Sequence, residues 1–117
     1  MVDKEFDEKI YRLNDKRDKF LELFDKIEIM QILIQKDGLT PEEKATFILS
    51  LNQLTKTIVK DAIDNQNEAY DLLKSEGMEG AQADIQQIFD SRLEDMVANS
   101  NQLNRVRTEL KNKKEPE

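Results

Sequence analysis

Cysteine, histidine and tryptophan are absent from the 117 residues of the chain, and it has only three glycines and two prolines. Without cysteine or histidine the chain cannot form a disulfide framework, a Cys/His metal site, a reactive thiol or a Ser–His nucleophile pair. The side chains that most often carry catalysis and metal binding are therefore missing. We expect a protein without enzymatic activity and without a cofactor.

Positive charge is also scarce, because 25 acidic residues outnumber 18 basic ones and the net charge is −7. Binding to nucleic acid or to an anionic membrane surface needs clustered lysine and arginine, so we expect neither partner. The longest apolar run, residues 27–34, contains Glu28 and Gln31 and is too short to cross a bilayer. The first ten residues are polar, unlike a signal peptide. We expect a cytoplasmic protein whose partner is another protein or a second copy of itself.

Helix-forming sequence divided by two breaks makes up the rest of the chain. In the first break Gly38 can close one helix, and Thr40, Pro41 and Glu43 form the capping-box pattern that begins the next. The second break, residues 75–80, contains the other two glycines. We therefore predict three helices and a disordered C-terminal tail, at residues 3–36, 41–75, 80–112 and 113–117.

Each predicted helix carries a seam of mostly apolar residues spaced alternately by four and three positions, which is typical of long helices that pack almost parallel. Short connections favour antiparallel neighbours. The sequence therefore predicts an all-α fold in one domain, residues 1–112, built as an antiparallel up-down-up three-helix bundle with coiled-coil-like helices. Exchange of the third helix with a second copy is the alternative. The seam predicted for the third helix is Ile85, Phe89, Arg92, Met96, Asn99, Leu103, Val106 and Leu110.

Several polar residues interrupt these seams. In an antiparallel hairpin about the first break, facing residues have numbers that sum to about 78, and about the second break to about 157. This register places Arg17 near Asp61, and Asn65 near Arg92. Two interpretations follow: a polar layer that sets helix register, which we favour, or an internal site for a small anion. The predicted layer is Arg17, Asp61, Asn65, Arg92 and Asp95.

Carboxylates recur on one face of each of the first two helices. The first acidic stripe is Asp15, Asp18, Glu22 and Asp25, and the second is Asp61, Asp64, Glu68 and Asp71. Metal binding and acid–base catalysis are disfavoured, because bundle metal sites use histidine and a slim bundle offers little cavity. Interleaved lysines favour an ordinary solvated face with i,i+4 pairs. Mimicry of nucleic-acid phosphates remains as the functional alternative.

Apolar residues exceed the needs of the seams around the first break. Residues 29–35 and 45–55 contain no charge, and four of their side chains point away from the seams. One more helix can cover one groove only, so the surplus favours an exposed patch that binds a partner or forms a dimer. Rotation of the helices that buries the surplus is the alternative. The predicted protein-interaction residues are Ile29, Ile32, Leu33 and Leu49.

Three hypotheses about function follow from these patterns. The first is a small chaperone or adaptor that shields an apolar helix of a client protein. The second is an acidic inhibitor whose carboxylates block a basic cleft of a partner enzyme. The third is a self-assembling scaffold protein. Response to salt separates the first two, because a complex held by carboxylates weakens with ionic strength and an apolar complex does not.

Overall fold

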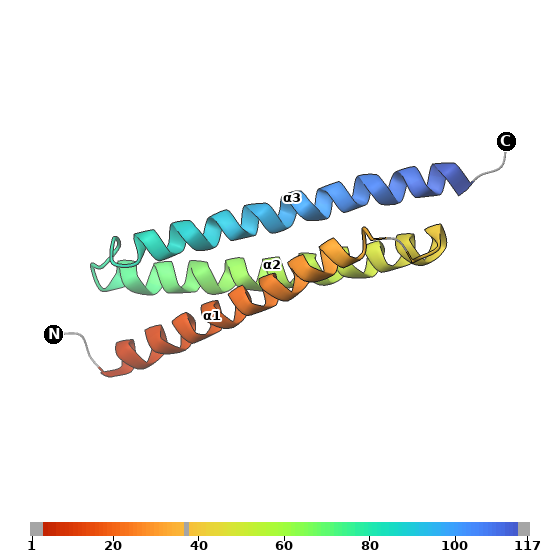
Figure 1. Cartoon of the computed structure of the whole chain (residues 1–117). Helices are drawn as coiled ribbons and strands as arrows, with labels where there is room; N and C mark the ends of the chain where they lie inside the picture. The colour runs from red at the N-terminus through yellow and green to blue at the C-terminus, as the bar shows by residue number, and fades with distance from the viewer. Residues whose placement is uncertain (1–3, 37, 115–117) are drawn as a thin grey trace.

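The computed structural model describes residues 4–36 and 38–114, and over these residues it contains three helices and no strand (Figure 1). They are α1 (Lys4–Leu33), α2 (Pro41–Ser75) and α3 (Ala83–Lys114). The helices run antiparallel in sequence order, which confirms the predicted all-α, up-down-up three-helix bundle. The bundle is slender, measuring 70 × 20 × 19 Å. α3 continues two residues beyond its predicted end, and residues 115–117 of the predicted tail lie outside the described residues.

The first turn forms through the local chemistry that the sequence predicts. Thr40 accepts a hydrogen bond from the Glu43 amide at 3.1 Å, and the Glu43 carboxylate accepts one from the Thr40 amide at 3.1 Å, which completes the capping box. α1 ends three residues earlier than predicted, because the amides of Gln35 and Lys36 bond to carbonyls three residues back and tighten the last turn. Gly38 then takes a φ of +119°, which only glycine adopts readily.

The second turn is a Schellman closure of α2. The Met78 amide bonds to the Leu73 carbonyl at 2.8 Å, and the Gly77 amide bonds to the Lys74 carbonyl at 3.0 Å. Gly77 has a φ of +70°, the left-handed conformation that this closure requires. Residues 78–82 then form turns, so α3 begins at Ala83 rather than at the predicted residue 80.

The predicted register of the first hairpin is confirmed by a buried hydrogen bond. The Asn65 amide donates to the Leu13 carbonyl at 3.1 Å, and the two residue numbers sum to the predicted 78. α1 and α3 run in the same direction, and the rings of Phe24 and Phe89 pack against each other at a tilt of 38° with centroids 5.6 Å apart. The core extends along the bundle from these two rings through Ile27, Ile48, Met96 and Leu103.

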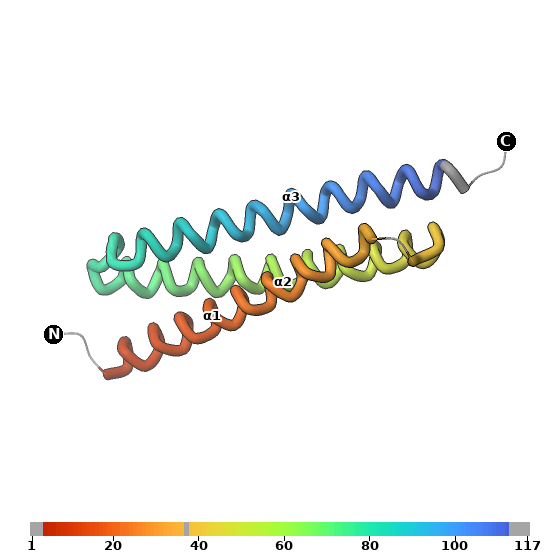
Figure 2. Tube along the Cα trace, viewed as in Figure 1, coloured from red at the N-terminus to blue at the C-terminus, as the bar shows by residue number. Residues whose placement is uncertain are grey.

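The seam of α3 is rotated from its predicted position. Ile85 and Asn99 were predicted to face the core, but both are exposed, and Leu93 is buried. The reason is that α3 packs mainly against α2, where Asn52, Val59 and Leu73 are buried. Figure 2 shows the same arrangement: α2 and α3 run side by side, and α1 is inclined to both.

Candidate protein-interaction surface

The four residues predicted to bind a partner are all solvent-exposed, but they do not form one patch. Ile29, Ile32, Leu33 and Leu49 have exposed fractions of 56%, 60%, 54% and 38%. Leu33 lines a groove between α1 and α2, whereas Leu49 lines a groove between α2 and α3. Ile29 and Ile32 lie on α1 outside the residues that line either of these grooves. The predicted surface is thus divided between two sides of the bundle.

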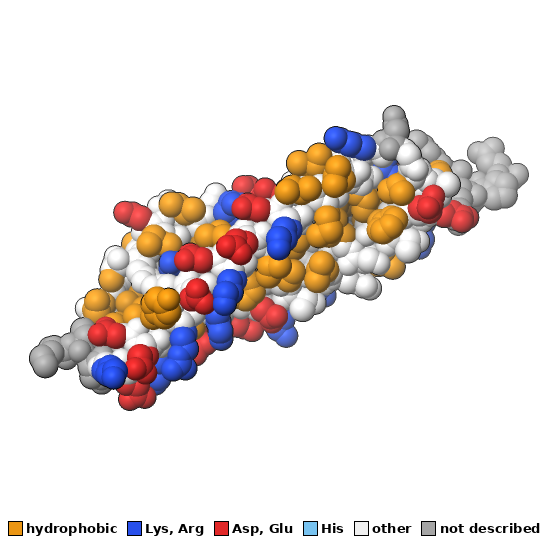
Figure 3. Space-filling view, turned by 60° about the horizontal axis from the view of Figure 1, so that its bottom comes forward, with side chains coloured by type: hydrophobic (Ala, Val, Ile, Leu, Met, Phe, Trp, Pro, Cys, Tyr) orange, Lys and Arg blue, Asp and Glu red, His pale blue; other side chains and the backbone are white. Residues whose placement is uncertain are grey.

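The groove between α1 and α2 has an almost wholly apolar lining. We call it the apolar groove; its volume is about 390 Å³. Ser50 is its one polar lining residue among the described residues, and four of its apolar side chains are exposed. On the face shown in Figure 3, hydrophobic side chains gather over the half of the molecule that contains the first turn. The lining residues are Met30, Leu33, Ile34, Leu39, Phe47, Ser50, Leu51 and Leu54.

Farther along the same two helices, the groove becomes charged. We call this part the charged groove; Phe20, Leu23 and Asn65 contribute to its lining. Lys16 and Lys19 line it from α1, whereas Asp61, Asp64 and Glu68 line it from α2. Within the described residues, no ion pair links the two helices across it. The groove therefore has a basic α1 side and an acidic α2 side.

The groove between α2 and α3 differs in having amides in its lining. Asn52 is buried there and donates to the Ser100 carbonyl at 3.2 Å and to the Asn104 side-chain oxygen at 2.7 Å. Its own side-chain oxygen has no hydrogen-bond partner within the described structure. Val59 and Val97 contribute apolar surface to the same groove. These amide bonds join α2 to α3 and stabilise that pair of helices.

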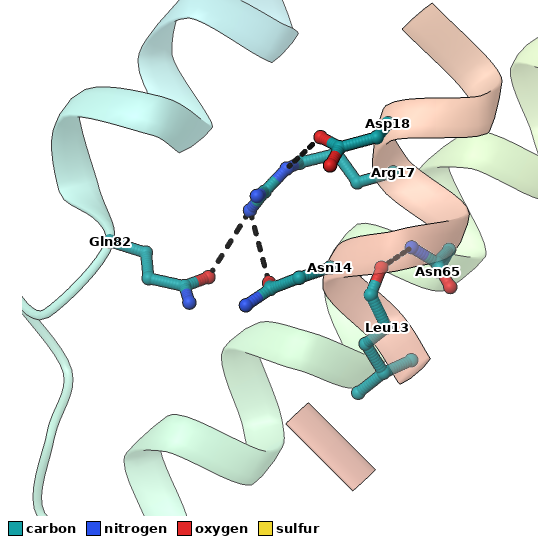
Figure 4. Close-up of polar contacts among 6 residues, drawn as sticks. All are labelled: Leu13, Asn14, Arg17, Asp18, Asn65 and Gln82. Atoms are coloured by element: carbon teal, nitrogen blue, oxygen red, sulfur yellow. Dashed lines mark hydrogen bonds and ion pairs between the residues drawn. The ribbon is translucent and has the colours of Figure 1, made fainter. Parts of the chain in front are cut away.

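The predicted polar layer does not assemble as one network. Arg17 donates to Asn14 at 3.1 Å and to Gln82, in the turn that precedes α3, at 3.3 Å, and its Nε lies 3.9 Å from Asp18 (Figure 4). Its predicted neighbour Asp61 instead lines the charged groove. The register of the two helices is correct, but the long arginine side chain extends towards the turn before α3 rather than towards Asp61 of α2. Asn65 bonds to α1, as Figure 4 also shows, and not to Arg92.

Arg92 links α3 to α1 at a different level of the bundle. Its Nη2 lies 2.7 Å from Asp25 and 3.2 Å from Glu28. The hydrogen bond to Asp25 raises the pKa of the guanidinium above its ordinary value, and the negative charges of Glu28 and Asp25 raise it further, while partial burial opposes the shift. Asp95, the last member of the predicted layer, is exposed. Arg17 thus links α1 to the turn before α3, and Arg92 separately links α3 to α1.

The two acidic stripes have different surroundings. In the stripe on α1, Asp15 pairs with Lys19 at 3.0 Å and Asp25 pairs with Arg92. Asp18 lies near Arg17. Only Glu22, which is exposed, has no ion pair among the described residues. In the stripe on α2, no member forms an ion pair within the described part of the chain. Three of its four members, Asp61, Asp64 and Glu68, line the charged groove, and Asp71 is exposed farther along.

Sequence reasoning missed most of the apolar groove. Met30, Phe47 and Leu54 flank the seams and are exposed, but they were not among the predicted interaction residues. Their position one step off each seam is the signal that could have found them, because side chains there border the groove between two packed helices. The basic side of the charged groove was also missed. The lysines of the first helix, including Lys16 and Lys19, were treated only as partners of acidic residues on the same helix.

Two other kinds of feature are not found in the described residues. No cluster of acidic side chains there is suited to hold a metal ion. None of the three helices, as far as they are described, is long and apolar enough to cross a membrane. No protein-family model, curated protein or solved structure matches the chain.

Proposed function

We propose that the protein is a non-enzymatic protein-interaction module, a small chaperone or adaptor that holds an apolar helix of a client in the apolar groove. The observation that carries this proposal is the lining itself: Met30, Leu33, Phe47 and Leu54 are large apolar side chains, each exposed, around a groove between two helices. Burial of such side chains against a client helix stabilises the complex by about 25 cal/mol per Å² of apolar surface removed from water.

The dimensions of the apolar groove suit a helix. Phe47 and Leu54 lie two turns apart on α2, about 10 Å along its axis. Side chains at positions i, i+3, i+4 and i+7 of a client helix cover the same length and lie on one face. Leu51, between them, is largely buried and forms part of the floor. The expected client is therefore an amphipathic helix that presents about two turns of aliphatic or aromatic side chains.

The test uses a fluorescent, net-neutral amphipathic peptide of about 18 residues, long enough for five helical turns. Leu33→Asp should weaken its binding at least about tenfold, because the substitution places a charge within an apolar contact. Ile29→Asp is the matched control, since Ile29 lies on the same helix with nearly the same exposure but outside the groove. Its affinity should stay within about twofold of wild type. Absence of peptide binding, or equal weakening by both substitutions, would overturn the proposal.

The acidic-inhibitor hypothesis has one observation in its favour, the three acidic residues of α2 that line the charged groove without an ion pair to a described residue. It predicts a basic partner and a complex that weakens steeply as salt rises. Measuring the affinities of the net-neutral peptide and of a basic polypeptide at low and high salt separates the two proposals. Binding in the apolar groove should change little, because no charged residue lines it within the described structure.

A further inference from the structure

We infer that a second copy of the chain occupies the groove between α1 and α2, so that the apolar and charged grooves form the interface of a homodimer. The inference rests on the proposed function, because it names the molecule that covers the apolar groove when no client is bound. It adds the charged groove, to which the proposed function gives no role.

The charge distribution identifies the partner. Lysines line the α1 side of the charged groove and carboxylates line the α2 side, at the same level of the bundle. A surface with this pattern is complementary to itself if α1 of one copy faces α2 of the other. Lys16 and Lys19 of each copy then lie opposite Asp61 and Asp64 of its partner. Lys19 already pairs with Asp15, but the exposed fractions of the two side chains are 70% and 49%. Exposed ion pairs contribute little to stability, so the lysine can exchange partners.

Only one orientation of the two-fold axis satisfies this pattern. If the axis runs along the bundle between the two copies, each α1 faces the partner's α2, and the two apolar grooves meet at the same end. If the axis is perpendicular to the bundle, α1 faces α1 and the second copy is reversed end to end. An axis that crosses the charged groove then places lysines opposite lysines, and an axis that crosses between the two grooves places each apolar groove opposite a charged one. We therefore assign the axis parallel to the helices, which gives a closed, isologous dimer.

The same axis pairs the apolar side chains. By the register of the first hairpin, Met30 and Leu33 of one copy lie at the level of Phe47 of the other, and Leu23 lies at the level of Leu54. The two-helix face from residue 47 to residue 68 of α2 is about 30 Å long and about 20 Å wide. This footprint, on the order of 600 Å², is smaller than the roughly 800 Å² per partner of a standard interface. The dimer should therefore be weak enough for a client helix to displace one copy.

The experiment measures absolute mass by light scattering over a range of concentrations. Wild type should approach twice the chain mass of 13.7 kDa, and Leu33→Asp should remain a monomer. The double variants Lys16→Glu/Lys19→Glu and Asp61→Lys/Asp64→Lys should each be monomeric, because like charges then face each other. An equimolar mixture of the two double variants should dimerise, since both faces of the heterodimer are then attractive. Circular dichroism confirms that each variant is folded.

Matched controls separate this interface from a general effect of charge. Lys56→Glu/Lys60→Glu makes the same change in charge, but both lysines line the groove between α2 and α3, so the dimer should persist. The chain has no cysteine, so Lys36→Cys supplies a unique site for a spin label near the first turn. The distance between labels in the dimer should be less than half the 70 Å length of the bundle, because both first turns lie at the same end.

The outcomes also separate the inference from the proposed function. A monomeric wild type, a mixture that stays monomeric, or labels at opposite ends of the dimer would overturn the inference. If the peptide still bound to a monomeric wild type with Leu33 required, the proposed function would stand alone. If the chain dimerised as described and the peptide neither bound nor displaced the second copy, the proposed function would fail, and the dimer would be the scaffold of the third hypothesis.

Discussion

At the scale of single residues, the bundle retains polar side chains inside its core at a cost in stability. Gln31 lies in the seam of α1 between Ile27 and Ile34 with an exposed fraction of only 3%. Neither its side-chain nitrogen nor its side-chain oxygen has a hydrogen-bond partner in the described structure. A buried amide without partners is destabilising by about 1–3 kcal/mol relative to an apolar group of the same shape.

Gln31→Met should therefore stabilise the protein by about 1–2 kcal/mol, because methionine fills the space of glutamine without a polar group to desolvate. Urea unfolding followed by circular dichroism measures the change. Gln87→Met on the exposed surface of α3 is the control and should alter stability by less than about 0.5 kcal/mol. A loss of stability in the Gln31 variant would mean that its amide has a partner, such as an ordered water molecule.

Arg92 shows the opposite case, a polar side chain with two partners on a neighbouring helix. Arg92→Gln should lower the free energy of unfolding by about 0.5–1 kcal/mol, since the bridge to Asp25 and Glu28 is partly solvated. The raised pKa keeps the Arg92 guanidinium charged in the folded protein. The bridge therefore contributes its full stabilisation at any pH below the ordinary arginine pKa, and this stabilisation is lost only in strong alkali. The difference between wild type and variant should be constant from about pH 6 to about pH 9. A difference that changed within that range would contradict this assignment.

At the scale of helices and turns, local chemistry explains where the elements begin and end. Two glycines of the second turn allow a direct comparison, because neither has an atom within 4 Å of an added Cβ. Gly77 has a φ of +70°, whereas Gly80 lies outside the left-handed region. Gly77→Ala should destabilise the protein by about 1 kcal/mol, and Gly80→Ala should be neutral or slightly stabilising. Thermal unfolding of the two variants tests this difference, and equal melting temperatures would refute it.

These elements also show how far the sequence predicts the structure. The capping box at Thr40, the glycine closures and the hairpin register depend on neighbouring residues or on counting along the helices, and all three were predictable. The rotation of α3 was not, because a strict heptad places Ile85 and Asn99 as plausibly in the core as Leu93. Packing against α2 decides between them, and packing depends on all three helices together. The direction of the Arg17 side chain was unpredictable for the same reason.

At the scale of the whole molecule, one face of the bundle combines an apolar end with a charged continuation. The predicted interaction residues lie in the half of the hairpin that contains the apolar groove, but only Leu33 among them lines that groove. A list of surplus apolar residues cannot show which of them border the same groove, because that depends on the angle at which α1 and α2 pack. Both proposals concern this face: a client helix binds to it, and a second copy covers it at rest.

The central claim is that the apolar groove between α1 and α2 is the surface that binds a helix. The most direct measurement is nuclear magnetic resonance of the labelled protein during titration with the net-neutral amphipathic peptide. The account predicts that the largest chemical-shift changes occur at Met30, Leu33, Phe47 and Leu54. Changes confined to the groove between α2 and α3, at Val59, Val97 and Asn101, would contradict it.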